Sequence, residues 1–228
     1  MKYRSQIVTA ASGSVGGCVY SRNRSGSYIR NRSLPVNTNT TQQAVVRSAL
    51  TTLVVRWTSI LTVAQRSGWE TWAANTPQTD AIGQTYNMTG QNAFISMNTL
   101  RIQVGLSVID VAPAIFAGAS LTPSGMASAT AATSILSVTF NNLDVWATAV
   151  GGALLVYAAR PQNPSKLFFA GPYRFMGRIN GAAVAPTSPQ PITDTFAFAA
   201  GQRIHVKFRA VNANAQISGP VKSSILAV

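Results

Sequence analysis

The clearest hydrophobic pattern in the chain is an alternation with a period of two near the C-terminus. Ile204, Val206, Phe208 and Ala210 are separated by polar residues, so the four apolar side chains share one face of an extended segment. This alternation predicts a half-buried antiparallel strand. We expect His205, which lies between two of these positions, to be exposed on the polar face.

The same period recurs in shorter runs through residues 132–228. Turn-forming pairs such as Asn141-Asn142 and Asn180-Gly181 separate these runs. Regularly spaced short strands with turns between them are typical of β-sandwiches. We therefore predict six or seven strands here, with apolar faces that include Leu136, Val138, Phe140, Leu154, Val156, Ala158, Tyr173, Phe175, Ile179, Phe196 and Phe198.

Residues 37–104 instead show a helical period and predict three helices. The apolar stripe of the first helix is spaced by four, three, four and three residues, at Val46, Leu50, Leu53, Trp57 and Ile60. This helix is rich in Val and Thr, which lowers its intrinsic propensity, so it requires packing to remain helical.

The next two predicted helices carry capping signals. Thr62 and Gln65 form a capping box at the start of the second helix. Thr89 is the predicted N-cap of the third helix, which ends before Gly105. The helical spacing of Trp57, Trp69 and Trp72 predicts either a core cluster or, since aromatic residues are enriched at interfaces, an intersubunit seam.

Two segments lack a regular pattern. Residues 1–36 are rich in Gly and Ser, and only two short pieces, 18–22 and 27–31, are extended enough to pair as a hairpin. We expect this segment to be an arm that becomes ordered against a partner. Residues 105–131 contain Pro113, Pro123 and many small residues, and predict a connector.

These patterns together predict an α+β protein. Its parts are an extended basic N-terminal arm (1–36), a small helical module (37–104), a connector (105–131) and a C-terminal antiparallel β-sandwich (132–228).

The distribution of charge adds a functional expectation. The chain has 18 basic and 5 acidic residues, a formal net charge of +13, and nine of the basic residues precede Glu70, the first acid. Such an imbalance favours anionic partners. Arginines interleaved with tyrosines make the arm the candidate partner-binding site, through Tyr20, Arg22, Arg24, Tyr28, Arg30 and Arg32.

Two partners suit this arm. Arginine forms bidentate bonds with carboxylates, which suits an acidic protein surface. Arginine also neutralises phosphates while tyrosine stacks on bases, which suits nucleic acid. We favour the protein partner because no recognised nucleic-acid module accompanies the arm.

The remaining composition argues against an enzyme. Charged residues make up only 10% of the chain, which suits a protein buried in an assembly. Cys18 and His205 are the single cysteine and histidine, and the five acids are widely spaced, so we predict no catalytic, metal or cofactor site. The N-terminus lacks the apolar region of a signal peptide, and no apolar run is long enough for a membrane helix.

The C-terminal region resembles a fibronectin type III or related immunoglobulin-like domain. The resemblance rests on Ser137-Val138-Thr139-Phe140, on Ala153-Leu154-Leu155-Val156-Tyr157, and on the segment from Ile204 to Asn212 followed by Ile217-Ser218-Gly219-Pro220. Phe140 stands where that family usually has a tryptophan, and Ile204 where it usually has a tyrosine. The resemblance implies a two-sheet sandwich.

The first half resembles uncharacterised virion structural proteins of tailed bacteriophages. The residues that carry this likeness are Gly16-Gly17, Tyr20-Ser21-Arg22, the run from Arg30 to Asn37, Gln43, Trp57, the run from Leu61 to Trp69, Thr89-Gly90 and Asn98-Thr99-Leu100-Arg101. It implies a structural protein located in the virion after synthesis in the host cytoplasm.

The resulting hypothesis is a capsid cement or decoration protein, a homo-oligomer that binds the major capsid protein or other virion proteins. A neck or tail protein of the virion and a non-specific nucleic-acid-binding protein remain alternatives. A small hydrolase is a further class, against which the scattered acids argue.

Overall fold

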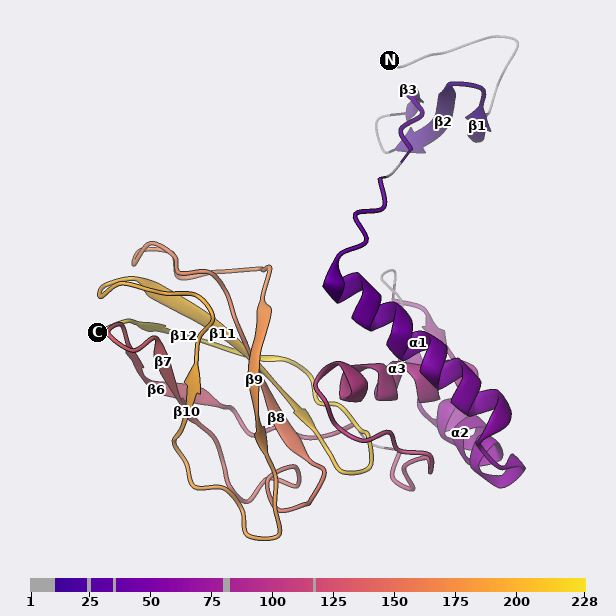
Figure 1. The fold of residues 1–228 in the computed structure, drawn as a ribbon. Coiled ribbons are helices and arrows are strands. Elements are labelled where there is room, and N and C mark those ends of the chain that lie inside the picture. The colour runs from indigo at the N-terminus through magenta and orange to yellow at the C-terminus, as the bar shows by residue number, and fades with distance from the viewer. Residues whose placement is uncertain (1–10, 24–25, 35, 80–82, 117) are drawn as a thin grey trace. The chain divides into compact units, whose positions relative to one another are not determined.

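A computed structural model describes residues 11–23, 26–34, 36–79, 83–116 and 118–228 (Figure 1). The chain divides into two units, residues 1–41 and 42–228. Helices and antiparallel sheets are both present, so the fold is α+β as the sequence predicts.

The first unit contains a small antiparallel sheet with the strand order β1-β2-β3. Its strands are β1 (Gly13–Val15), β2 (Cys18–Asn23) and β3 (Gly26–Asn31). The pairing of β2 with β3 confirms the predicted hairpin. The short strand β1, which the sequence pattern did not predict, pairs with β2 through the turn at Gly16, whose φ of 56° favours glycine.

Three helices open the second unit, and their predicted capping signals are confirmed. They are α1 (Thr41–Ser59), α2 (Val63–Asn75) and α3 (Gly90–Gln103). The Thr62 hydroxyl accepts the backbone N–H of Gln65, and the Gln65 side chain accepts the backbone N–H of Thr62. Thr89 caps α3, and Gly105 follows its end with a φ of 73°. The two-residue strands β4 (Gln78–Thr79) and β5 (Thr85–Tyr86) pair between α2 and α3.

The predicted apolar stripe of α1 is partly wrong. Leu53 and Trp57 are buried, but Val46, Leu50 and Ile60 are exposed. The buried positions follow steps of four, from Ala49 through Leu53 and Trp57 to Leu61, so the contact face is narrower than the stripe.

Seven strands follow the helices and form two antiparallel sheets. They are β6 (Gly125–Thr130), β7 (Ile135–Thr139), β8 (Ala153–Ala158), β9 (Arg174–Asn180), β10 (Gln190–Thr193), β11 (Arg203–Val211) and β12 (Val221–Leu226). One sheet has the order β10-β7-β6 and the other β12-β11-β8-β9. Both contribute to one core that includes Leu136, Val138, Leu154, Val156, Val206 and Phe208, all fully buried.

Several sequence predictions in this region need correction. Strand β6 lies in the segment interpreted as a connector, where its small residues hid the alternation. Phe196 and Phe198 lie in a loop, although Phe198 is buried. An irregularity between Val156 and Tyr157 shifts the register against β9, so Phe175 is exposed although Ile179 is buried.

The most important difference concerns His205, which we expected to be exposed. Its side chain is only 4% exposed because the loop after β8 covers it. The ring stacks on Phe169 with a centroid distance of 5.3 Å, and its Nε2 lies 2.9 Å from the carbonyl oxygen of Lys166. Burial lowers the pKa of His205, with the charges of Arg203 and Lys166 acting in the same direction.

The helices and the strands of the second unit are joined by a buried arginine. Arg101 on α3 is fully buried, and its guanidinium donates to the carbonyl oxygens of Ser107, Asn212 and Gly151 at 2.7, 2.9 and 3.2 Å. Beside it, Leu100, Val104 and Leu106 pack against Ala153, Leu155 and Val211 on the outer face of β8 and β11. Part of this sheet face is therefore covered by the C-terminal end of α3 (Figure 1).

Within the described ranges, no single helix is long and apolar enough to cross a membrane. The pair α1 and α2 reaches that length and composition only when taken together, with a bend of 118° between them.

Candidate partner-binding surfaces

The predicted arm site lies on the β1-β2-β3 sheet, and the strand register assigns its residues to two faces. Tyr20 is opposite Ile29, and Arg22 is opposite Ser27, so Tyr20 and Arg22 share one face. Tyr28 is opposite Ser21, and Arg30 is opposite Val19, which places Tyr28 and Arg30 on the other face.

Arg32 follows β3, and its backbone N–H donates to the carbonyl oxygen of Gly17. Arg24 lies outside the described residues. Arg22 and Arg30, which the sequence grouped into one clamp, thus lie on opposite faces of the sheet, and a partner that contacts both has to reach both faces.

This sheet has no hydrophobic interior. No described residue between 11 and 41 is buried, and Arg22, Arg30 and Arg32 are exposed. A three-stranded sheet normally needs a covered hydrophobic face for stability. The described part of the first unit does not supply that cover.

The three predicted tryptophans lie together in the core of the helices. Trp69 is fully buried, and Trp57 and Trp72 are 9% and 6% exposed. Phe94 contacts Trp57 and Trp69 with ring centroids 5.7 and 5.5 Å apart. Of the two roles that the sequence left open, core packing is the one these contacts display.

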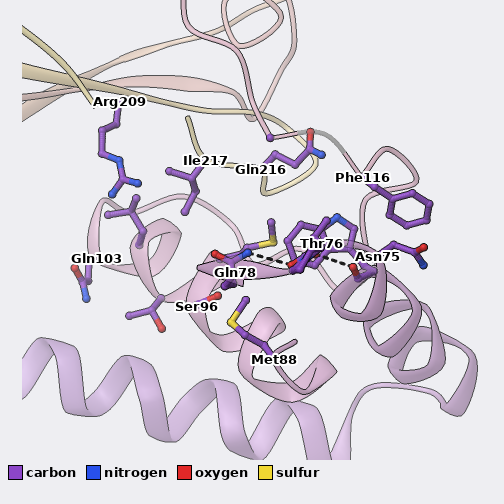
Figure 2. Close-up of a pocket in the computed structure, with 16 residues that line it drawn as sticks. Asn75, Thr76, Gln78, Met88, Ser96, Gln103, Phe116, Arg209, Gln216 and Ile217 are labelled. Carbon is purple, nitrogen blue, oxygen red and sulfur yellow. Dashed lines mark hydrogen bonds between the residues drawn. The ribbon is translucent and has the colours of Figure 1, made fainter. Parts of the chain in front are cut away.

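A pocket of about 690 Å³ lies between the helices and the strands of the second unit. Figure 2 shows Arg209, Gln216 and Ile217 on one wall, and Asn75, Thr76, Gln78, Ser96 and Gln103 on the other. Its described lining has amides, hydroxyls and one arginine, and no carboxylate, imidazole or thiol occurs among these residues to act as a general base. The indole N–H of Trp72, which also lines the pocket, has no hydrogen-bond partner among the described residues.

Every acid that the structure describes is engaged within the chain. Asp110 binds Arg56 in a bidentate salt bridge at 2.6 and 2.7 Å. Glu70 accepts the backbone N–H of Gly90, and Asp144 accepts both the hydroxyl and the backbone N–H of Thr122. Asp194 is 5% exposed and accepts the backbone N–H of Phe196, and burial raises its pKa.

Most cations, by contrast, have no carboxylate partner. Within the described ranges, Arg56–Asp110 is the single salt bridge. Several other described cations contact carbonyl oxygens or aromatic rings, as Arg101, Arg178 and Lys207 do. The surplus of positive charge seen in the sequence is therefore a property of the surface.

Sequence reasoning missed two residues that organise the second unit. Trp146 is fully buried and contacts Phe140 edge-on with centroids 5.2 Å apart, so a core tryptophan is present six positions after Phe140. Arg101 was an ambiguous stripe position beside Leu100. The sequence could not show that the Arg101 guanidinium is buried among three carbonyl groups, because two of them, at Gly151 and Asn212, are distant in sequence.

A scan against known protein families finds no match for this chain, and a search of the curated proteins finds no significant match.

Proposed function

We propose that this protein is a non-enzymatic structural component of a tailed-bacteriophage virion, most specifically a capsid cement or decoration protein. It binds the shell and neighbouring copies through its N-terminal sheet and its helices. The observation that carries this proposal is the sheet of the first unit, which combines exposed arginines with the lack of any buried described residue. Such a sheet gains stability when a partner covers it.

The exposed side of α1 supports the same role. Val45, Val46, Leu50, Val54 and Val55 are between 37% and 51% exposed, on a helix that contains no acid. Apolar residues that recur along one helix suit contact with another protein.

We further infer that the seven strands from Gly125 to Leu226 form an immunoglobulin-like sandwich of the fibronectin type III kind. One sheet contains the first, second and fifth strands, and the other contains the third, fourth, sixth and seventh. This division of strands and the shared core support that assignment. In the assembled particle this region is the displayed part of the protein.

The test compares particle incorporation of the full chain with that of residues 37–228. Each is co-expressed with the virion structural proteins, and incorporation is measured by mass spectrometry and cryo-EM. We expect the truncated protein to fold but to be missing from the particles. Stoichiometric incorporation of the truncated protein would contradict the proposal.

A triple variant, Arg22→Gln with Arg30→Gln and Arg32→Gln, isolates the contribution of charge. A triple variant of Arg160, Lys166 and Arg174 to Gln is its matched control, since it removes the same charge at exposed positions of the second unit outside the helices. If cryo-EM density for the protein is found at the neck or tail, the proposed location changes from the shell to that site. If the protein is lost from particles that have released their DNA, the partner is nucleic acid.

A further inference from the structure

The outer face of the β12-β11-β8-β9 sheet carries a second concentration of positive charge. Strand register places Lys222 on β12, Lys207 on β11, Tyr157 on β8 and Phe175 on β9 in one row across the sheet. In the next row, Arg209 and Arg178 flank Leu155. The end of α3 covers Leu155 but leaves Lys207 and Tyr157 partly exposed and Lys222 exposed.

No described acid forms a salt bridge with this face. The four strands contain six cations and no carboxylate in their sequences. Arg209 donates to the carbonyl oxygen of Ser218, and Arg178 donates to that of Val104. These contacts fix the guanidinium groups without neutralising them.

The two lysines are directly opposite each other on antiparallel strands, and two like charges in this position repel each other and destabilise the strand pair. Aromatic rings hold them in place. The Lys207 ammonium lies 4.6 Å from the ring centroid of Tyr157 and 5.3 Å from that of Tyr173, and the Lys222 ammonium lies 5.9 Å from Tyr173. Burial lowers the pKa of Lys207, and the charges of Arg209 and Lys222 lower it further.

We propose that this face, centred on Lys207 and Lys222, binds a carboxylate-rich segment of a partner protein. Charge complementarity identifies the partner, because fixed ammonium groups that have no counterion among the described residues are satisfied by an external anion. Nucleic acid suits the face less well. Bases bind such sheets by stacking on open rings. Here an ammonium lies over Tyr157 and Tyr173, so among these three aromatic residues Phe175 is the one left for stacking.

A neighbouring cavity of about 250 Å³ gives the bound segment a place for one apolar side chain. It is lined by Leu167, Phe168, Phe169, Tyr173, His205, Lys222, Ser223 and Ser224. Leu167 and Phe168 are 75% and 78% exposed, so its rim is apolar and open. The expected ligand is thus an acidic peptide that includes a hydrophobic residue.

The test uses a fluorescent peptide that is rich in Glu and contains Leu, and it measures binding of this peptide to the full chain by fluorescence anisotropy. Single-stranded oligo(dT) is measured in the same way, as the probe for nucleic-acid binding. We expect Lys207→Gln combined with Lys222→Gln to weaken peptide binding by about tenfold. Arg47→Gln combined with Arg66→Gln removes the same charge elsewhere and should change the affinity by less than about twofold.

Carbodiimide crosslinking supplies a second readout, because it joins peptide carboxylates to lysine amines and the chain has only four lysines. Crosslinks at Lys207 and Lys222 are expected. Equal peptide affinity in the lysine variant, or tight oligo(dT) binding without peptide binding, would overturn the proposal. The result is independent of the virion role, since that role is tested by truncation of the first unit.

Discussion

The two units both contain antiparallel sheets, yet they differ in what holds those sheets together. In the first unit, described side chains are exposed or half-exposed on both faces of the β1-β2-β3 sheet. In the second unit, Leu136, Val156 and Phe208 are completely buried between two sheets. Backbone hydrogen bonds are common to both, so the two sheets differ in the burial of apolar surface and not in strand pairing.

Hydrogen exchange gives the largest contrast between the units. Amides of β2 and β3 should exchange at least about a thousandfold faster than those of β8 and β11, since a stable core opens at a cost of about 5 kcal/mol or more. The measurement is exchange followed by mass spectrometry on the isolated chain. Equal protection of β2 and β8 would remove the distinction between the two sheets.

Within the second unit, Trp146→Ala should have the largest effect on stability. The side chain is fully buried against Phe140, so its removal should lower the free energy of unfolding by about 3–5 kcal/mol. Urea denaturation measures the change. Leu143→Ala is the control, because Leu143 is 80% exposed and should contribute little.

Arg101→Met tests whether the link between helices and strands depends on hydrogen bonds. Methionine retains much of the volume but leaves the carbonyl groups of Ser107, Gly151 and Asn212 without their donor. We expect a loss of about 2–3 kcal/mol in the free energy of unfolding. Arg160→Met, at an exposed position, should be nearly neutral, and an equal loss in both variants would contradict this role.

Asp194→Asn should give the smallest change and a distinctive pH dependence. Because burial raises the carboxyl pKa, the folded state holds the proton more tightly, and stability falls as pH rises from the ordinary pKa of 3.8 through the raised value. Asparagine keeps an acceptor for the Phe196 N–H without the charge. At pH 7 the variant should be more stable by about 1 kcal/mol. Below pH 3 this advantage should disappear, and thermal melts across pH would measure it.

Local patterns predicted the parts of the fold that depend on neighbouring residues. The capping box at Thr62 needs only Gln65, and the β11 face needs only the alternation from Ile204 to Ala210, so both were readable. The β2-β3 hairpin was readable for the same reason. The small residues of β6 carry no such alternation. The position of this strand is set by its pairing with β7, which the sequence pattern does not contain.

Features that depend on distant segments were not predictable. His205 alternates with buried residues and looked exposed, but the loop at Lys166 and Phe169 covers it from 36 or more positions away in the chain. Division of the arm arginines between two faces follows from the register of β2 with β3, which is fixed only when the pairs form. The row of Lys222, Lys207 and Tyr157 likewise requires three strands to meet.

The Arg101 contacts also have a mechanical consequence. One side chain on α3 ties its own helix to the loops at Gly151 and Asn212, which precede β8 and follow β11. A force applied along the helices therefore reaches the centre of the sheet through short, stiff bonds instead of a flexible tether. A pull on the helical end would load the β-strands at once, and the second unit would move as one rigid body.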